Sequence, residues 1–98
     1  MSQPERAALF ARLQSRAVAA CAAAGMPADE LRGEAFFEDE LLFLSVSQYA
    51  ADGQLAWRSS HAGTPDSASL SDLAELGDEL VERVAADAKL ANAISGAE

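Results

Sequence analysis

The sequence predicts a two-layer α+β domain in which two helices lie on one face of a small antiparallel sheet. Three observations lead to this prediction: apolar residues at helical spacing near both ends of the chain, strand-forming residues in the middle, and an Asp-Gly pair between two strand-like segments. The chain has 98 residues, half of them apolar, which is enough for one modest core. We therefore expect a single domain over residues 1–98.

The first helix is expected over residues 3–24. Ser2 and Glu5 have the spacing of a capping box. Gly25 and Pro27 form a stop signal, because glycine accepts the left-handed conformation at a helix end and proline cannot continue the hydrogen-bond ladder. The expected apolar face of this helix consists of Leu9, Phe10, Leu13, Ala17, Ala20, Cys21 and Ala24.

A β-hairpin is predicted around Asp52-Gly53, where residues 41–49 and 55–60 are rich in strand formers. A two-residue turn at this pair would place Val46 opposite Ser59 and Tyr49 opposite Ala56. The face that would then point into the core carries Leu42, Leu44, Val46, Leu55 and Trp57. A three-residue loop would shift the pairing by one residue and divide this apolar set, so the two-residue turn is preferred.

A third strand is expected at the sheet edge over residues 35–37, after a polar connector at residues 28–34 and before a turn at Glu38-Asp39-Glu40. An isolated two-stranded hairpin is only marginally stable in water. The sheet is therefore expected to be two- or three-stranded, completed either by this strand or by a dimer partner.

The second helix is expected to begin at Ser69, with Asp72 three residues later, after a loop over residues 61–68 that is rich in Gly, Pro and Ser. Its apolar stripe follows the period of an α-helix and consists of Leu73, Leu76, Gly77, Leu80, Val84, Ala88 and Ala91. Residues 95–98 are expected to fray.

Composition favours some classes of partner over others. The formal charge of −9 comes from 16 acidic residues against 7 Lys and Arg. We therefore expect a protein partner with a basic surface and no direct binding of nucleic acid. Neither the start of the chain nor the alanine run after Arg16 has the pattern of a signal peptide or a membrane span. With Cys21 as the single cysteine, a cytoplasmic protein is expected.

No residue pattern indicates catalysis, so we expect no enzyme, no cofactor and no metal site. The single histidine, His61, lies next to Ser59 and Ser60, so a small hydrolase using His61 is retained only as a remote alternative. A solvated histidine at the end of a strand is the simpler interpretation. Cys21 lies on the apolar face of the first helix, where cysteine usually acts as a small hydrophobe.

The remaining features indicate protein binding. The sheet face opposite the core would present Phe43, Tyr49 and Arg58 with His61 close by, all residue types found in interface hot spots, although a third element of the chain would cover them equally well. The second helix adds an acidic face that consists of Glu75, Asp78, Glu79 and Glu82. The alternative interpretation is that this face is simply exposed to solvent and binds no partner.

The sequence thus favours a non-enzymatic module that inhibits or escorts a basic protein. Immunity proteins, phage-encoded anti-defence inhibitors and secretion chaperones are the classes considered. A homodimeric structural or scaffold protein, paired through the open sheet face or the sheet edge, is the alternative.

Overall fold

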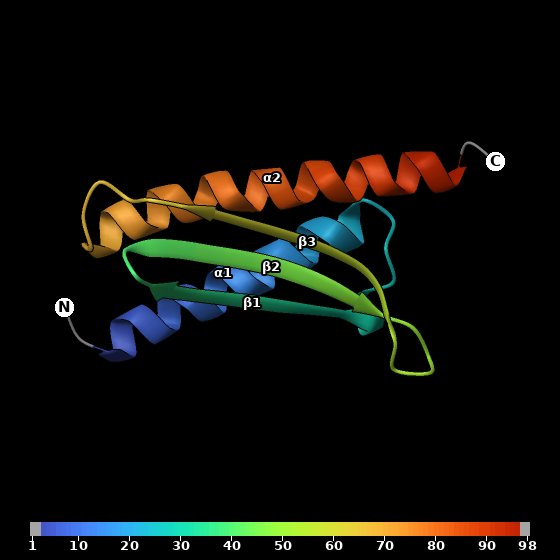
Figure 1. Cartoon of the computed structure of the whole chain (residues 1–98), viewed down its shortest axis with the longest axis horizontal. Helices are drawn as coiled ribbons and strands as arrows, with labels where there is room; N and C mark the ends of the chain where they lie inside the picture. The colour runs from blue at the N-terminus through green and yellow to red at the C-terminus, as the bar shows by residue number, and fades with distance from the viewer. Residues whose placement is uncertain (1–2, 97–98) are drawn as a thin grey trace.

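A computed structural model describes residues 3–96 of the chain, which form two layers (Figure 1). Helix α1 (Gln3–Ala23) is followed by a short 3-10 helix η1 (Ala28–Glu30) and by strands β1 (Leu31–Glu38), β2 (Leu41–Tyr49) and β3 (Leu55–Gly63). Helix α2 (Leu70–Gly96) completes the chain. The α+β prediction is therefore confirmed, and the sheet has three strands.

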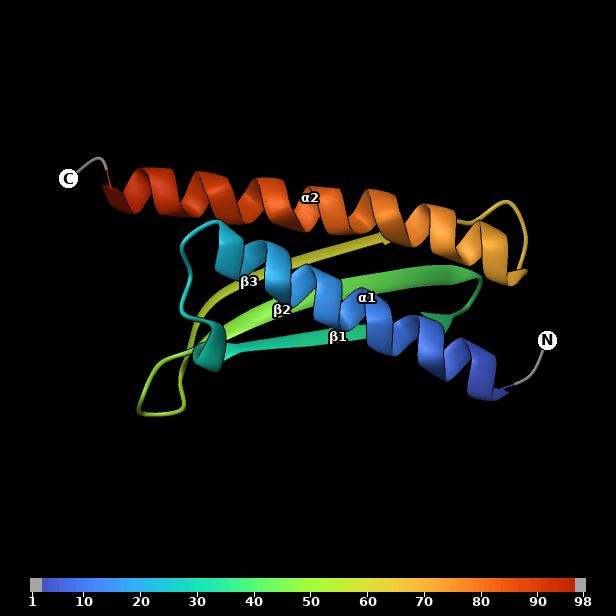
Figure 2. The same cartoon turned by 180° about the vertical axis from the view of Figure 1, so that it is seen from behind.

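The strands form an antiparallel meander in the order β1-β2-β3, and both helices pack on the same face of it (Figures 1 and 2). Helix α1 contacts β1 and β2, whereas α2 contacts β2 and β3. The other sheet face, here called the open face, is covered by no element within residues 3–96 (Figure 1). The connections between β1 and β2 and between β2 and β3 are short, and short connections join strands that are antiparallel neighbours in a sheet.

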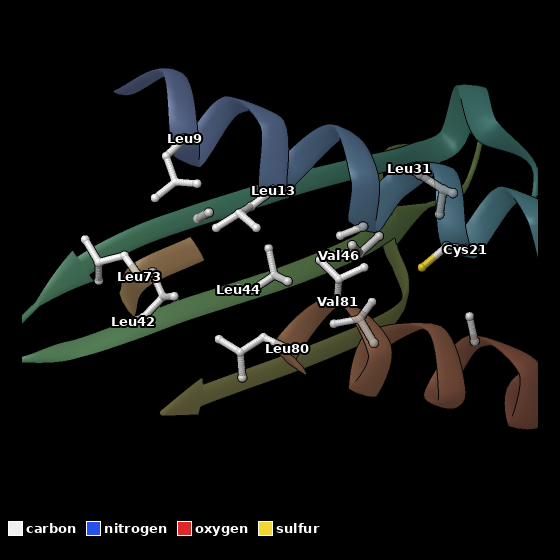
Figure 3. Packing of buried hydrophobic residues seen from close by; sticks show 14 residues of the cluster. Leu9, Leu13, Cys21, Leu31, Leu42, Leu44, Val46, Leu73, Leu80 and Val81 are labelled. Atoms are coloured by element: carbon white, nitrogen blue, oxygen red, sulfur yellow. The ribbon is translucent and has the colours of Figure 1, made fainter. Parts of the chain in front are cut away.

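The core lies between the helices and the inward row of β2, as Figure 3 shows. Leu42, Leu44 and Val46 have no exposed surface, as expected from the alternation of side chains along the strand. The predicted helix faces are largely confirmed: Leu9, Leu13, Ala17 and Cys21 are buried on α1, and Leu73, Leu80, Val84 and Ala88 on α2. Trp57 is half-buried and packs against this core.

The helix ends follow the predicted signals. Gly25 has a φ of 110°, in the left-handed region that ends α1, and the Cys21 carbonyl accepts a 3.2 Å hydrogen bond from Met26 N. At the start of α2, the Ser69 hydroxyl accepts a 3.3 Å bond from Asp72 N. The predicted capping role of Ser2 and the fraying of Ala97 and Glu98 lie outside the described residues, whereas residues 95 and 96 continue α2.

Strand β1 is longer than predicted. It begins at Leu31 rather than Ala35, so the connector expected over residues 28–34 is mostly strand. Its N-terminal half looks polar because the inward position Gly33 has no side chain, and α1 passes so close that an added Cβ would lie 2.8 Å from the Gln14 carbonyl. The Gln14 side chain also accepts a 3.0 Å bond from Ala35 N, which satisfies a backbone donor of β1.

The β2–β3 connection corrects the predicted turn. Ala50 N donates to the Gln54 carbonyl at 2.8 Å, so residues 51–53 form a three-residue loop with Gly53 at a φ of 84°. A β-bulge where Gln48 and Tyr49 pair with β3 shifts the register by one residue. This shift restores the expected pairing of Val46 with Ser59. Tyr49 consequently pairs with Leu55, not with Ala56, and the prediction that Leu55 faces the core is wrong.

Candidate functional site

The open face carries a pair of stacked aromatic rings near the β1–β2 turn. Phe36 of β1 lies opposite Phe43 of β2, with ring centroids 4.8 Å apart and planes inclined by 16°. Phe36 is 38% exposed although it is a large apolar side chain. Stacked rings on a sheet surface add stability beyond their buried area, yet here one side of the stack remains in water.

A second apolar pair lies near the opposite end of the open face. The β-bulge turns Leu55 outward beside Tyr49, and Leu55 is 51% exposed. The loop geometry that the sequence analysis rejected therefore adds an apolar residue to the predicted contact surface. Phe43, Tyr49 and Arg58 lie on this face as predicted, and Phe36 and Leu55 join them.

Between the two apolar pairs runs a cross-strand row of Arg32, Ser47 and Arg58, here called the arginine row. Arg58 Nε donates a 2.9 Å hydrogen bond to the Ser47 hydroxyl, and Ser47 as a residue is only 5% exposed although no helix covers it. Neither Arg32 nor Arg58 has an ion-pair partner among residues 3–96. The neighbouring row contributes a single acid, Glu34, so the centre of the open face has two positive charges against one negative.

Carboxylates surround this centre at both ends of the sheet. We call them the acidic rim: Asp29, Glu30 and Asp52 at one end, and Glu38, Asp39 and Glu40 at the other. All except Glu30 belong to exposed residues. The Glu30 carboxylate accepts a 2.9 Å bond from Gln48 Nε2, a side chain of the inward row, so Glu30 lies at the end of the sheet and not over the open face. At the first end, Asp29 and Glu30 share a surface hollow with Arg32 and Tyr49, so the rim directly adjoins the apolar and basic centre.

The structure places His61 away from this surface. It lies within β3, not at the start of a loop, and its Nε2 is 2.7 Å from Asp87 Oδ2 of α2 on the helix-covered side of the sheet. The Ser59 hydroxyl donates to the same Oδ2 at 2.6 Å. These hydrogen bonds, that of Ser59 first and then that of His61, lower the pKa of Asp87 from its ordinary value of 3.8 against the opposing effect of burial.

The Ser59–His61–Asp87 cluster does not have the order of a catalytic triad. In a triad the imidazole lies between the hydroxyl and the carboxylate, so that it can take the hydroxyl proton. Here the carboxylate lies between the other two groups, and Ser59 is 3% exposed. The arrangement instead ties β3 to α2. Burial raises the pKa of the nearby Cys21 thiol, and the Asp87 charge raises it further, which disfavours the reactive thiolate.

The acidic helix face is also separate from the aromatic surface. Glu75, Asp78, Glu79 and Glu82 are exposed on α2, in the layer behind the open face (Figures 1 and 2). Asp78 forms an ion pair with Arg16 of α1, which links the two helices. The predicted set of partner-binding residues is therefore divided: Phe43, Tyr49 and Arg58 lie together on the open face, whereas His61 and the four acids of α2 lie on the other side of the sheet.

No protein-family model, no curated protein and no solved structure matches this chain. The functional assignment consequently depends on the surface itself. Among residues 3–96, no helix is long and apolar enough to cross a membrane, and no group of three His, Cys, Asp or Glu residues is arranged to hold a metal ion.

Four residues were missed by the sequence analysis for different reasons: Phe36, Leu55, Asp87 and Arg32. Arg32 was assigned to the connector of residues 28–34, although it lies in β1. Phe36 was identified only as part of a short strand, although its alternation with Ala35 already predicts an outward position. The outward position of Leu55 follows only when a three-residue loop is combined with a β-bulge, and the sequence analysis considered the loop without the bulge. Asp87 contacts residues 26 and 28 positions away, and nothing in its local sequence signals that contact.

Proposed function

We propose that this protein is a non-enzymatic protein-binding module whose contact surface is the open face of the sheet. The observation that carries the proposal is the exposure of Phe36 and Leu55 on a face that no element within residues 3–96 covers. Large apolar side chains in water are costly and mark interaction surfaces when they gather on one face. Phe43 and Tyr49 extend the same surface between them.

The composition of the surface resembles that of a protein interface. Aromatic residues and arginine, the types enriched in hot spots, occupy its centre, and charged groups occupy its edge. Because the acidic rim surrounds the centre, the partner that fits best has a basic periphery. Inhibition or escort of such a protein, as by an immunity protein, an anti-defence inhibitor or a secretion chaperone, is the role that this arrangement supports.

Charge favours a different protein over a second copy as the occupant. Joining two chains of charge −9 brings two acidic rims together, and this repulsion opposes association. Light scattering at tens of micromolar tests this directly. We expect a monomer, and a dimer that dissociates when Leu55 is replaced by Ser would instead establish the scaffold alternative.

The decisive experiment compares two exposed leucines. Leu55 is 51% exposed on the open face, and Leu90 is 62% exposed on α2, so each can be replaced by Ser without opening the core. Immobilised wild-type protein, Leu55→Ser and Leu90→Ser are incubated with the same cell lysate at increasing salt. We expect a partner that the wild type and Leu90→Ser retain, that Leu55→Ser loses, and whose association rate falls with ionic strength.

Two results would refute the proposal. One is a partner retained equally by both leucine variants, because its binding would not use the open face. The other is the absence of any protein that distinguishes Leu55→Ser from Leu90→Ser across the salt series. A partner lost only when the acids of α2 are neutralised would move the contact to the helix layer.

A further inference from the structure

The arginine row places two positive charges at the centre of the open face of a protein whose net charge is −9. Thirteen of the 16 acids lie downstream of residue 32, yet neither Arg32 nor Arg58 forms an ion pair within the described chain. Both arginines flank Ser47, and the Arg58–Ser47 bond anchors one guanidinium to the sheet. This bond uses Nε, which leaves the terminal Nη donors of Arg58 available to another acceptor.

From this placement we infer that the arginine row binds a carboxylate side chain of the partner. The inference rests on the proposed function and adds the chemistry of the group that occupies its centre. Planar guanidinium groups bind carboxylates through paired hydrogen bonds, which fixes orientation as well as adding affinity. Glu34, the one acid in the neighbouring row, leaves the centre one positive charge in excess.

The apolar pairs set the spacing of the bound segment. The arginine row lies between the Phe36–Phe43 stack and the Tyr49–Leu55 pair, so the acid of the partner is flanked by apolar side chains on both sides. A carboxylate fits this position better than a phosphate group, because the surrounding −9 protein repels a dianion more strongly than a monoanion.

The acidic rim would attract basic proteins in general, and the arginine row would select among them. A uniformly basic surface is drawn to the acidic rim but meets two arginines at the centre, and like charges that face each other are strongly unfavourable. A partner with a basic periphery and one central acid satisfies both regions. The arginine row would thus reject cationic proteins that the charge of the chain alone would attract.

The test uses a displayed library of random linear peptides selected on the full-length protein, with bound peptides eluted and sequenced. We expect enriched peptides to contain an Asp or Glu between apolar residues. The double variant Arg32→Gln/Arg58→Gln should bind them roughly tenfold more weakly. The matched control, Arg12→Gln/Arg83→Gln, removes the same charge from exposed positions on α1 and α2 and should bind as the wild type does.

The side-chain Nε–H signals of the arginines give a second readout in nuclear magnetic resonance spectra. Those of Arg32 and Arg58 should shift together on addition of a selected peptide, while that of Arg83 stays in place. Replacing the acid of the peptide by its amide should remove the shift. A peptide with phosphoserine in place of the acid should bind more weakly, and tighter binding would overturn the assignment of a carboxylate.

The failure of this inference is distinct from that of the proposed function. Peptides that Leu55→Ser loses but that the arginine double variant still binds would overturn the inference and leave the open face as the contact surface. Peptides that Leu55→Ser and the double variant both bind as tightly as the wild type does, with none in the selection dependent on Leu55 or on the two arginines, would overturn both.

Discussion

The two rows of side chains on strand β2 lie on opposite faces of the sheet and differ sharply in composition and burial. Its inward residues Leu42, Leu44 and Val46 are fully buried against two helices. Its outward residues are Phe43, Ser45, Ser47 and Tyr49, and no helix within residues 3–96 covers that face (Figure 1). The inward row of β2 is aliphatic at these three positions and close-packed against the helices. The outward face mixes aromatic rings, hydroxyls and arginines, a composition typical of protein interfaces.

The largest expected difference between the faces is in stability. Leu44→Ala removes a fully buried side chain and leaves a cavity beneath α1 and α2, which should lower the free energy of unfolding by about 3 kcal/mol. Phe43→Ala, its neighbour on the outward row, should cost only about 1 kcal/mol, because it loses mainly the half-exposed stack with Phe36. Urea denaturation measures both values, and equal losses would contradict the separation of the two faces.

The register of this sheet was largely predictable, because alternation of apolar and polar residues over nine residues leaves one way to bury β2. The pairing of Val46 with Ser59 is confirmed, and it survives because the extra residue of the loop is cancelled by a bulge. The orientation of Leu55 was not predictable in the same way, since a bulge exchanges the two faces at a single point.

Residues that act through distant contacts escaped prediction for a different reason. Gly33 lies on the inward row of β1, yet its role is to let the α1 backbone approach, and a missing side chain leaves no apolar signal. Asp87 lies on α2 among alanines, and only the folded structure brings it to Ser59 and His61. Local patterns therefore identified the layers of the fold but not the contacts that join them.

Asp87 forms a polar cluster with Ser59 and His61 on the covered side of the sheet, and its ionisation should make the stability of the protein depend on pH. Because the folded-state pKa of Asp87 is lowered, its ionised form stabilises the protein above the ordinary value of 3.8, and this contribution disappears as the pH falls through the lower folded-state value. Asp87→Asn should cost about 1 kcal/mol near neutral pH, a modest value since the side chain is 44% exposed to screening solvent.

Urea denaturation at a series of pH values checks this prediction. The difference between wild type and Asp87→Asn should be constant at neutral pH and should close in acid. Glu75→Gln, which removes the same charge from an exposed position on α2, serves as the control and should stay close to the wild type at every pH. A gap between wild type and Asp87→Asn that persists in strong acid would show that ionisation of Asp87 is not what ties β3 to α2.

The smallest expected effect concerns the acidic rim, where the open face departs from what stability alone would select. Asp39 and Glu40 form the two-residue β1–β2 turn with φ values of 53° and 63°, a conformation that favours glycine at both central positions. Glu40→Gly should therefore stabilise the fold by about 0.5 kcal/mol, which is the left-handed strain that glycine relieves minus the larger conformational entropy that glycine loses on folding.

Glu40→Gln removes the charge but keeps the strain, so in thermal denaturation it should match the wild type. If both variants bind the partner more weakly while only the glycine variant is more stable, the charge of this turn serves recognition at the expense of the fold. Equal stability of the two variants would mean that the turn bears no strain for glycine to relieve.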